Sequence, residues 1–273
     1  MAEAEERPVS PSLVVNVLIG VFLAALLSGG LVYLRVLLSQ TVRSPDDIKA
    51  RLGLSILGTI PRVSENTALE ILDEQSSELA EAYRTLRSNL AFLTVNGAPQ
   101  VIMVTSTLPS EGKSFSAIAL ASSFARLGKR TLLVDVDLRN SALNRTLGLE
   151  KSDGGGLSAL LTSKEGNIFD EVVQLPDRDF DLLPIGRRLV NPVDLLAGLK
   201  LRNLLDAARE GYDQIIVDAA PTLSLADAVE TSKACDGVLY VVEYQRAKTT
   251  AINASVDWLK DSGAIIYGAV LTE

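Results

Sequence analysis

The chain has 273 residues, a formal net charge of −8, no histidine and a single cysteine, Cys235. The lack of histidine excludes Ser-His-Asp and Cys-His catalysis and His-ligated metals, and one cysteine cannot form an internal disulfide, a zinc cluster or a CxxC redox pair. The acidic balance argues against nucleic-acid binding, which needs a basic face.

The N-terminal region contains an uncharged apolar run from Leu13 to Leu34, which explains a high mean hydropathy of +0.24 in a chain with 22% charged residues. At about 1.5 Å per residue, a helix of this length spans roughly 33 Å, enough to cross a hydrocarbon core of about 30 Å. A cleaved signal peptide would need a basic N-terminal flank, and here that flank is acidic. The run is also too long and too free of charge for a typical buried core helix. We therefore expect a membrane anchor.

The charges around this run predict its orientation and the division of the chain. Four basic residues follow the span, so its C-terminal side should be cytoplasmic: Arg35, Arg43, Lys49 and Arg51. Ser44-Pro45 has the form of a helix start. We expect a short extracytoplasmic N-terminus (1–12), a transmembrane helix (13–35), a juxtamembrane connector (36–68) and a cytoplasmic domain (69–273).

Within the last part, helical patterns alternate with short apolar runs rich in β-branched residues. Helices are expected at 78–96 and 114–127, and strands at 101–105, 131–136, 214–217, 237–243 and 264–271. Strands that are apolar on both faces and separated by helices predict an α/β fold with a mostly parallel sheet covered on both sides. Such a fold binds ligands at the carboxyl ends of its strands.

A candidate phosphate-binding loop follows the first of these strands. The residues 106–114 read STLPSEGKS, which is the strand, loop, Gly-Lys-Ser and helix order of a P-loop. Lys113 would reach the outer phosphates, and the Ser114 hydroxyl would ligate Mg²⁺. The strict pattern GxxxxGK[ST] fails at its first position, Thr107, and an ordinary helix entry is the simpler alternative.

Three carboxylates at strand ends favour the nucleotide interpretation. Asp135 and Asp137 lie at the end of one expected strand and Asp218 at the end of another, on the same edge of the sheet as the loop. Clustered carboxylates are costly unless a cation lies between them, and Mg²⁺ with a nucleotide supplies one. The alternative is that these aspartates cap the following helices or pair with Arg139.

These segments together resemble the bacterial tyrosine kinases of capsule and exopolysaccharide assembly. The resemblance rests on five motifs in order, TSTLPSEGKS (105–114), LLVDVDLRNSAL (132–143), NPVDLL (191–196), IIVDAAPTLSLADA (215–228) and EAYRTLR (81–87). The anchor and connector, from Pro8-Val9-Ser10-Pro11 to TVRSPDDIKARLGLSILGTIPR, are similar to the second transmembrane helix and adjoining segment of polysaccharide co-polymerases.

The resemblance implies roles for individual residues. The ATP-binding loop would comprise Ser110, Glu111, Gly112, Lys113, Ser114 and Phe115. Lys113, Asp135 and Asp137 would be catalytic, the aspartates activating the tyrosine hydroxyl, and Ser114, Asp135 and Asp218 would hold Mg²⁺. A ring-shaped homo-oligomer would form through Glu81, Arg84 and Arg87, which otherwise are surface charge pairs on a helix.

The function implied is that of a membrane-anchored, ATP-dependent protein tyrosine kinase that regulates exopolysaccharide polymerisation and export. It would sit in the inner membrane as a single-pass protein, with a periplasmic co-polymerase partner and tyrosine-bearing protein substrates, and would not bind nucleic acid. Phosphoryl transfer would depend on positioning, charge neutralisation by Mg²⁺ and Lys113, and a carboxylate base.

The sequence departs from the family in three respects. Ser110 replaces the usual glycine, and Ala219-Ala220 replace the usual Thr-Pro. The sequence ends at Glu273 without the family's tyrosine-rich tail, first transmembrane helix or periplasmic domain, so we expect the substrate tail on another chain or its loss by truncation. Two other functions are possible alternatives. One is a non-catalytic ATP-binding regulator of polysaccharide chain length, and the other is a Min/Par-type ATPase, whose signature lysine is replaced here by Leu108.

Overall fold

The structure is a computed structural model that describes residues 13–38, 41–64, 67–95, 97–149, 155–163, 166–187, 192–224 and 226–273. The chain divides into two compact units, residues 1–40 and 41–273. The segment 1–12, expected to be extracytoplasmic, lies outside the described residues, and so does Asn191 of the NPVDLL motif.

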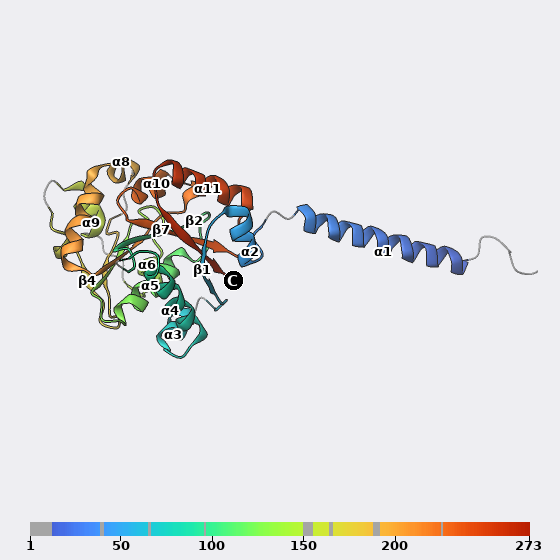
Figure 1. Cartoon of the computed structure of the whole chain (residues 1–273), viewed down its shortest axis with the longest axis horizontal. Helices are drawn as coiled ribbons and strands as arrows, with labels where there is room; N and C mark the ends of the chain where they lie inside the picture. The colour runs from blue at the N-terminus through green and yellow to red at the C-terminus, as the bar shows by residue number, and fades with distance from the viewer. Residues whose placement is uncertain are drawn as a thin grey trace, which may run out of the picture. The chain divides into compact units, whose positions relative to one another are not determined.

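The first unit contains one helix, α1 (Leu13–Leu38), which includes the whole apolar run (Figure 1). The stretch Leu13–Leu34 is long and apolar enough to cross a membrane, and none of it is buried inside the protein. Its length and composition make this stretch a candidate membrane span.

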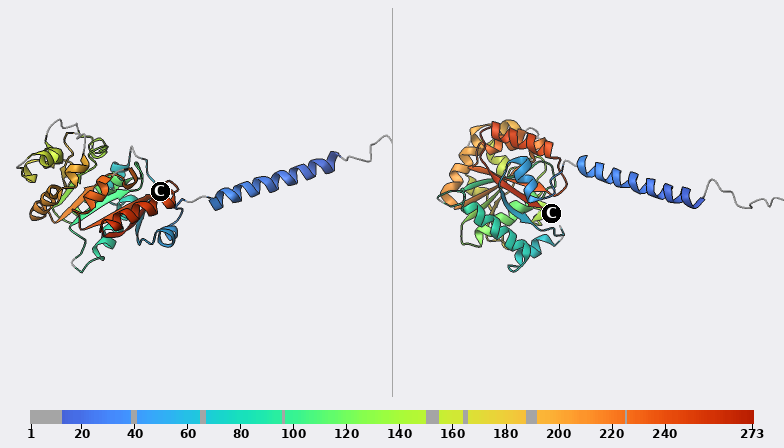
Figure 2. Two further views of the ribbon diagram at one scale, coloured as in Figure 1. Left: turned by 90° about the horizontal axis from the view of Figure 1, so that it is seen from above. Right: turned by 45° about the vertical axis from the view of Figure 1, so that its right-hand side comes forward.

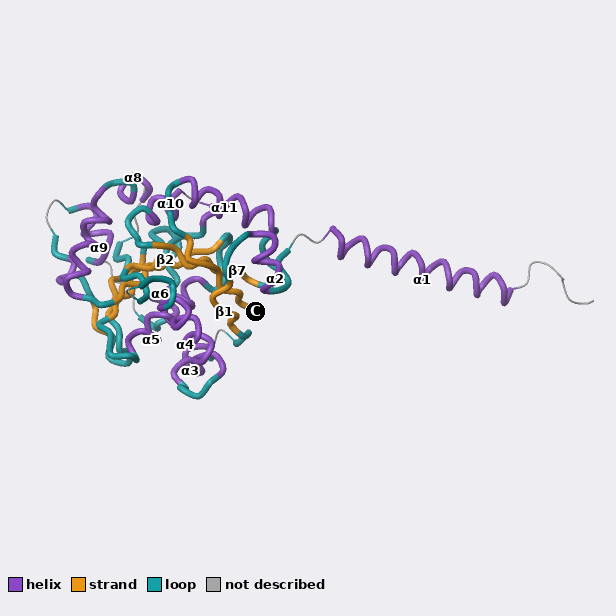
Figure 3. The backbone as a smooth tube through the Cα atoms, in the orientation of Figure 1, coloured by secondary structure: helices purple, strands orange, loops and turns teal. Residues whose placement is uncertain are grey.

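The second unit is built on an eight-stranded sheet with the strand order β1-β8-β7-β2-β6-β3-β5-β4 (Figures 1 and 3). Its strands are β1 (Ile56–Ile60), β2 (Val101–Ser106), β3 (Thr131–Asp135), β4 (Val173–Gln174), β5 (Asp181–Leu183), β6 (Gln214–Asp218), β7 (Gly237–Glu243) and β8 (Ile266–Thr272). All neighbouring strands pair in parallel except β4 with β5, so the sheet is mostly parallel, as the sequence predicts.

Helices cover both faces of this sheet (Figure 2). They are α2 (Pro45–Asp47), α3 (Ala68–Asp73), α4 (Glu78–Ala91), α5 (Lys113–Ala125), α6 (Leu143–Thr146), α7 (Gly156–Thr162), α8 (Pro192–Leu196), α9 (Leu199–Gly211), α10 (Ala226–Ser232) and α11 (Thr249–Asp261), with shorter helical turns at Ile48–Leu52, Ile168–Asp170 and Thr222–Ser224. In Figure 1, α3, α4 and α5 lie on one side of the strands, and α8, α10 and α11 lie on the other.

Two hydrophobic cores result from this layering, one on each face of the sheet. Successive residues of the buried strand β2 alternate between them, with Val101 and Met103 in one core and Ile102 and Val104 in the other. The alternation follows from the two-residue period of a strand. Because both faces are apolar, the polar side chains of the central strands collect at the strand ends.

The described residues of the expected connector from Thr41 onward fold as part of the second unit. The Ser44 hydroxyl caps α2 by accepting a hydrogen bond from Asp47 N at 3.2 Å, which confirms the expected helix start. Ile48 is fully buried in the core, and the following strand β1 pairs in parallel with β8. The compact unit therefore begins at Thr41.

Candidate functional site

The candidate phosphate loop joins the carboxyl end of β2 to the first turn of α5, where the sequence predicts it. Gly112 precedes the helix with φ +84°, a left-handed conformation that favours glycine. Ser110 has φ +63°, one of two non-glycine residues with a positive φ in the described part of the chain. The loop thus turns twice through left-handed backbone before the backbone N–H groups of α5 begin, and such N–H groups are suited to phosphate oxygens.

Lys113 lies at the centre of a buried cluster of charges. Its ammonium nitrogen Nζ is 2.9 Å from Asp137 Oδ2 and 3.1 Å from Asp218 Oδ1, and it donates a hydrogen bond to Ser114 Oγ at 3.1 Å. Burial alone would lower the pKa of Lys113, but Asp218 and Asp137 outweigh it and raise that pKa. The lysine therefore stays charged.

Asp135 completes the cluster from the end of β3, directly beside Asp218 on β6 in the sheet register. It accepts hydrogen bonds from the Ser141 hydroxyl and, at 3.3 Å, from Asp137 N. Burial, and next the charge of Asp218, raise the pKa of Asp135 to about 8, and burial also raises the pKa of Asp218. Buried carboxyl groups that lie this close together retain protons that they would lose in water, because two neighbouring negative charges repel each other.

The cluster has the charge and the open ligand position that a divalent cation needs. The cluster holds three carboxylates and a single ammonium, which contacts Asp137 and Asp218. Asp218 Oδ2 is buried without a hydrogen-bond partner among the described residues. No group of three acidic or cysteine residues in that part of the chain is placed to hold a metal ion alone. This arrangement fits Mg²⁺, which is usually held by one or two carboxylates together with phosphate oxygens and water.

Arg139 does not pair with these three aspartates. Its guanidinium Nε lies 2.7 Å from Asp227 Oδ2, on α10. Asp137 does take part in local backbone bonding, because it accepts a hydrogen bond from Asn140 N at 3.0 Å. This bond closes a turn and caps no helix, because the next helix, α6, begins at Leu143. The Arg139 alternative is wrong.

The side chain of Glu111 bonds the loop's own backbone. One carboxylate oxygen accepts a hydrogen bond from Leu108 N at 2.6 Å, and the other, Oε1, is buried without a partner among the described residues. Burial raises the pKa of Glu111 to about 7, and the hydrogen bond from Leu108 N opposes the rise. The ring of Phe115 packs against the ring of Tyr83 on α4, with the two ring centroids 6.1 Å apart.

A buried cluster of hydroxyl groups connects the loop to the neighbouring strand β7 and to the turn at Thr222. The sequence analysis did not predict this cluster. The Tyr240 hydroxyl lies 2.9 Å from Thr107 Oγ1 and 3.1 Å from Thr222 Oγ1. The Thr222 hydroxyl also lies within hydrogen-bonding distance (3.0 Å) of the carbonyl oxygen of Ser106. Thr107 stands at the position where the strict P-loop pattern has glycine, and its hydroxyl ties the loop to the neighbouring strand β7. The available sequence signal was Tyr240, a hydroxyl-bearing residue in the middle of the otherwise apolar strand interior VLYVV (238–242).

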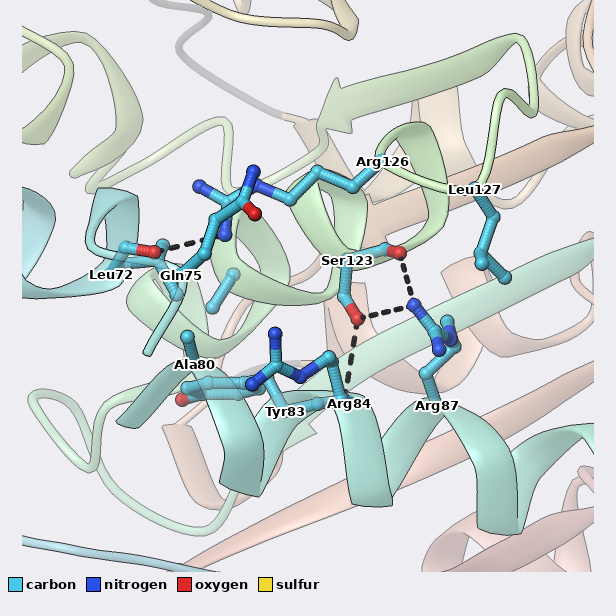
Figure 4. A pocket seen from close by; sticks show the side chains of 10 residues that line it. Leu72, Gln75, Ala80, Tyr83, Arg84, Arg87, Ser123, Arg126 and Leu127 are labelled. Atoms are coloured by element: carbon cyan, nitrogen blue, oxygen red, sulfur yellow. Dashed lines mark hydrogen bonds between the residues drawn. The ribbon is translucent and has the colours of Figure 1, made fainter. Parts of the chain in front are cut away.

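The residues Glu81, Arg84 and Arg87 lie on α4, away from this cluster. Glu81 and Arg84 form an ion pair, while Arg87 donates hydrogen bonds to Ser123 O at 2.7 Å and Ser123 Oγ at 3.2 Å. Arg84, Arg87 and Ser123 line a cavity of about 190 Å³ between α4 and α5 (Figure 4). Burial, and next the charge of Arg84, lower the pKa of Arg87.

The phosphate loop, the acidic strand ends and the parallel sheet together define a P-loop type nucleotide-binding domain. The AAA domain family matches residues 99–260, which is more than half of the chain. The tyrosine-protein kinase YwqD of Bacillus subtilis is 31% identical over 201 residues, which cover 73% of this chain and 83% of YwqD. The chain therefore belongs to the bacterial tyrosine-protein kinase family.

Two further similarities agree with that assignment. The tyrosine-protein kinase Etk of Escherichia coli K12 is 27% identical over 99% of this chain, but the chain spans only 40% of Etk. The solved kinase domain of the Escherichia coli tyrosine kinase ETK superposes with a TM-score of 0.77 at 26% identity, covering 85% of this chain and 94% of that domain. The family resemblance noted from the motifs is confirmed.

Proposed function

We propose that this chain transfers the γ-phosphoryl group of ATP to tyrosine hydroxyls of proteins. The observation that carries the proposal is the buried cluster of Lys113, Asp135, Asp137 and Asp218 at the end of the phosphate loop. Family membership supports the tyrosine as acceptor, since the relatives compared above are named tyrosine-protein kinases.

In this proposal each group has a separate task. Backbone N–H groups of residues 110–115 and the Lys113 ammonium bind the β- and γ-phosphates, and Ser114, Asp135 and Asp218 hold Mg²⁺. When bound, Mg²⁺ neutralises charge on the phosphates. Asp137 or Asp135 accepts the proton of the attacking tyrosine hydroxyl.

The proposal extends to assembly and location. We infer that Glu81, Arg84 and Arg87 contribute to contacts between subunits of a ring, because Glu81 and Arg84 form an exposed ion pair on α4 and Arg84 and Arg87 line the cavity between α4 and α5. We infer that α1 anchors the chain in the inner membrane with residues 41–273 in the cytoplasm, because basic residues follow the apolar span. The role in exopolysaccharide export, with a periplasmic co-polymerase partner, rests on the family resemblance.

The decisive experiment is a transfer assay with the purified full chain in detergent. The chain is incubated with Mg²⁺ and ATP together with a glutamate–tyrosine copolymer, and phosphotyrosine on the copolymer is measured. We expect transfer by the unmodified chain and its loss in Lys113→Met, with Ser114→Ala strongly impaired. Removing Mg²⁺ with a chelator should stop the reaction as well.

Two controls separate the possible results. Circular dichroism of each variant shows whether lost transfer reflects lost folding. Nucleotide binding is measured in parallel with a fluorescent ATP analogue. A chain that binds ATP and changes its oligomeric state, but transfers no more phosphate than Lys113→Met, would be a non-catalytic regulator.

A further inference from the structure

The chain's six tyrosines differ sharply in how accessible their hydroxyls are. Tyr83 and Tyr240 are almost completely buried, and their hydroxyls are bonded to Ser116 and to Thr107 with Thr222. The Tyr212 hydroxyl donates to Asp181 at 2.8 Å, and that of Tyr267 donates to Asp236 O at 3.1 Å.

Among the described tyrosines of the unit 41–273, only Tyr244 has both an exposed ring and a hydroxyl group that donates no hydrogen bond to the protein. The residue is 40% exposed. Its hydroxyl accepts a hydrogen bond from Gln245 Nε2 at 2.8 Å, and no described residue accepts its proton. The remaining tyrosine, Tyr33, lies within the candidate membrane span.

The position of Tyr244 links it to the phosphate loop. Tyr244 directly follows β7, so it lies at the carboxyl edge of the sheet, where β2 enters the loop. Tyr212 and Tyr267 lie at or near the amino ends of β6 and β8, on the opposite edge. An accessible tyrosine and the nucleotide loop thus share one edge of the molecule.

One hydrogen bond joins the turn that carries Tyr244 directly to the loop, and two more connect them through Thr272. Arg246, two residues further on, donates to Pro109 O at 3.0 Å. Tyr244 N donates to Thr272 O at 2.8 Å, and the Thr272 hydroxyl bonds Glu111 O at 3.2 Å. Gln245, in the same turn, has φ +55°, a left-handed conformation that is uncommon for a non-glycine residue.

We propose that Tyr244 is an internal phosphate acceptor of this chain, an inference that rests on the proposed kinase function. The Tyr244 oxygen forms a bond to the γ-phosphorus of ATP while the bond from that phosphorus to the β-bridging oxygen breaks, and ADP leaves with the electron pair. The phenolic proton passes to a carboxylate of the cluster. The product phosphate carries a charge of about −1.5 to −2. The guanidinium of Arg246, two residues away, is paired with Glu243 at 3.0 Å.

Site-resolved phosphate mapping on the full chain tests this proposal. The detergent-purified chain is treated with a tyrosine phosphatase, freed of it, and incubated with Mg²⁺, ATP and the glutamate–tyrosine copolymer. Peptide mass spectrometry then gives the phosphorylated fraction at each tyrosine, and the copolymer reports transfer to an external acceptor. We expect Tyr244 to be the main phosphorylated tyrosine of the chain.

The matched variants are Tyr244→Phe and Tyr267→Phe, each of which removes one hydroxyl and keeps the ring. Tyr244→Phe should lose nearly all phosphotyrosine on the chain and keep copolymer transfer, whereas Tyr267→Phe should keep both. If the unmodified chain phosphorylates the copolymer but leaves Tyr244 unmodified, the inference is wrong and the kinase function stands. If neither the copolymer nor the chain gains phosphate, the kinase function itself fails.

Discussion

The Lys113 ammonium lies 2.9 Å from the Asp137 carboxylate, in an ion pair whose side chains are only 6% and 3% exposed. The same nitrogen is 3.1 Å from Asp218. The lysine that is expected to bind phosphate therefore also neutralises the acidic strand ends. A bound nucleotide must share this cation with two carboxylates, so the folding of the site and its chemistry depend on one side chain.

Replacing Lys113 by methionine should destabilise the fold as well as stop transfer. Removing one partner of a buried ion pair leaves an uncompensated charge, which typically costs about 3–5 kcal/mol. We expect the free energy of unfolding of Lys113→Met, measured with urea near neutral pH, to fall by about that amount. Lys113→Arg, which keeps the charge, is the control and should lose less. Equal stability of the unmodified chain and Lys113→Met would show that the pair contributes nothing.

The parts of the fold with strong local patterns were predictable from the sequence. The strands at 101–106, 131–135, 214–218, 237–243 and 266–272 were all expected within two residues, because each is an uninterrupted apolar run. The helix at 78–91 was expected to continue to 96, since the apolar residues Phe92, Leu93 and Val95 extend the pattern. These three side chains are instead exposed beyond the helix end.

The parts that depend on distant contacts were not predictable. The strands β4 and β5 have two and three residues, too few to show a period, and β1 becomes a strand by pairing with β8, more than 200 residues away in the chain. The carboxylates at the strand ends were found because parallel strands end on one edge. The hydroxyl contacts of Tyr240 were not, because no local pattern indicates which group a buried hydroxyl meets.

Ser110 should be replaceable by glycine with a gain in stability. Its φ of +63° is left-handed backbone, which costs a non-glycine residue about 1–2 kcal/mol. Glycine removes that strain but loses about 0.5–1 kcal/mol of backbone entropy, so Ser110→Gly should gain up to about 1.5 kcal/mol of stability in urea unfolding. The matched control is Ser262→Gly, at φ −76°, where glycine relieves no strain and should destabilise. A loss of stability in Ser110→Gly would contradict this account.

Ionisation of Glu111 should make stability fall with rising pH. Burial raises its pKa from 4.5 to about 7, so the folded chain holds this proton more tightly than the unfolded chain. The contribution is complete below the ordinary value of 4.5 and is lost as the pH rises through about 7. Its full size is on the order of 3 kcal/mol.

The comparison with Glu111→Gln isolates this contribution from other titrating groups. The glutamine can still accept the hydrogen bond from Leu108 N but does not titrate. Relative to the unmodified chain, Glu111→Gln should therefore become more stable as the pH rises from about 5 to about 8 in urea unfolding. Parallel stability curves for the two proteins would show that Glu111 does not ionise in this range.

Removal of the Tyr240 hydroxyl should weaken ATP binding through the loop. In Tyr240→Phe the buried Thr107 hydroxyl loses its partner at 2.9 Å, whereas Thr222 keeps its contact with Ser106 O. An unsatisfied buried hydroxyl costs about 1–3 kcal/mol, and a loop loosened by 1 kcal/mol should bind nucleotide about fivefold more weakly. The measurement is the Kd of a fluorescent ATP analogue together with urea unfolding. Tyr267→Phe removes a hydroxyl bonded to Asp236 O at the opposite edge, so it should leave that Kd unchanged. If both variants raise the Kd equally, Tyr240 has no specific part in holding the loop.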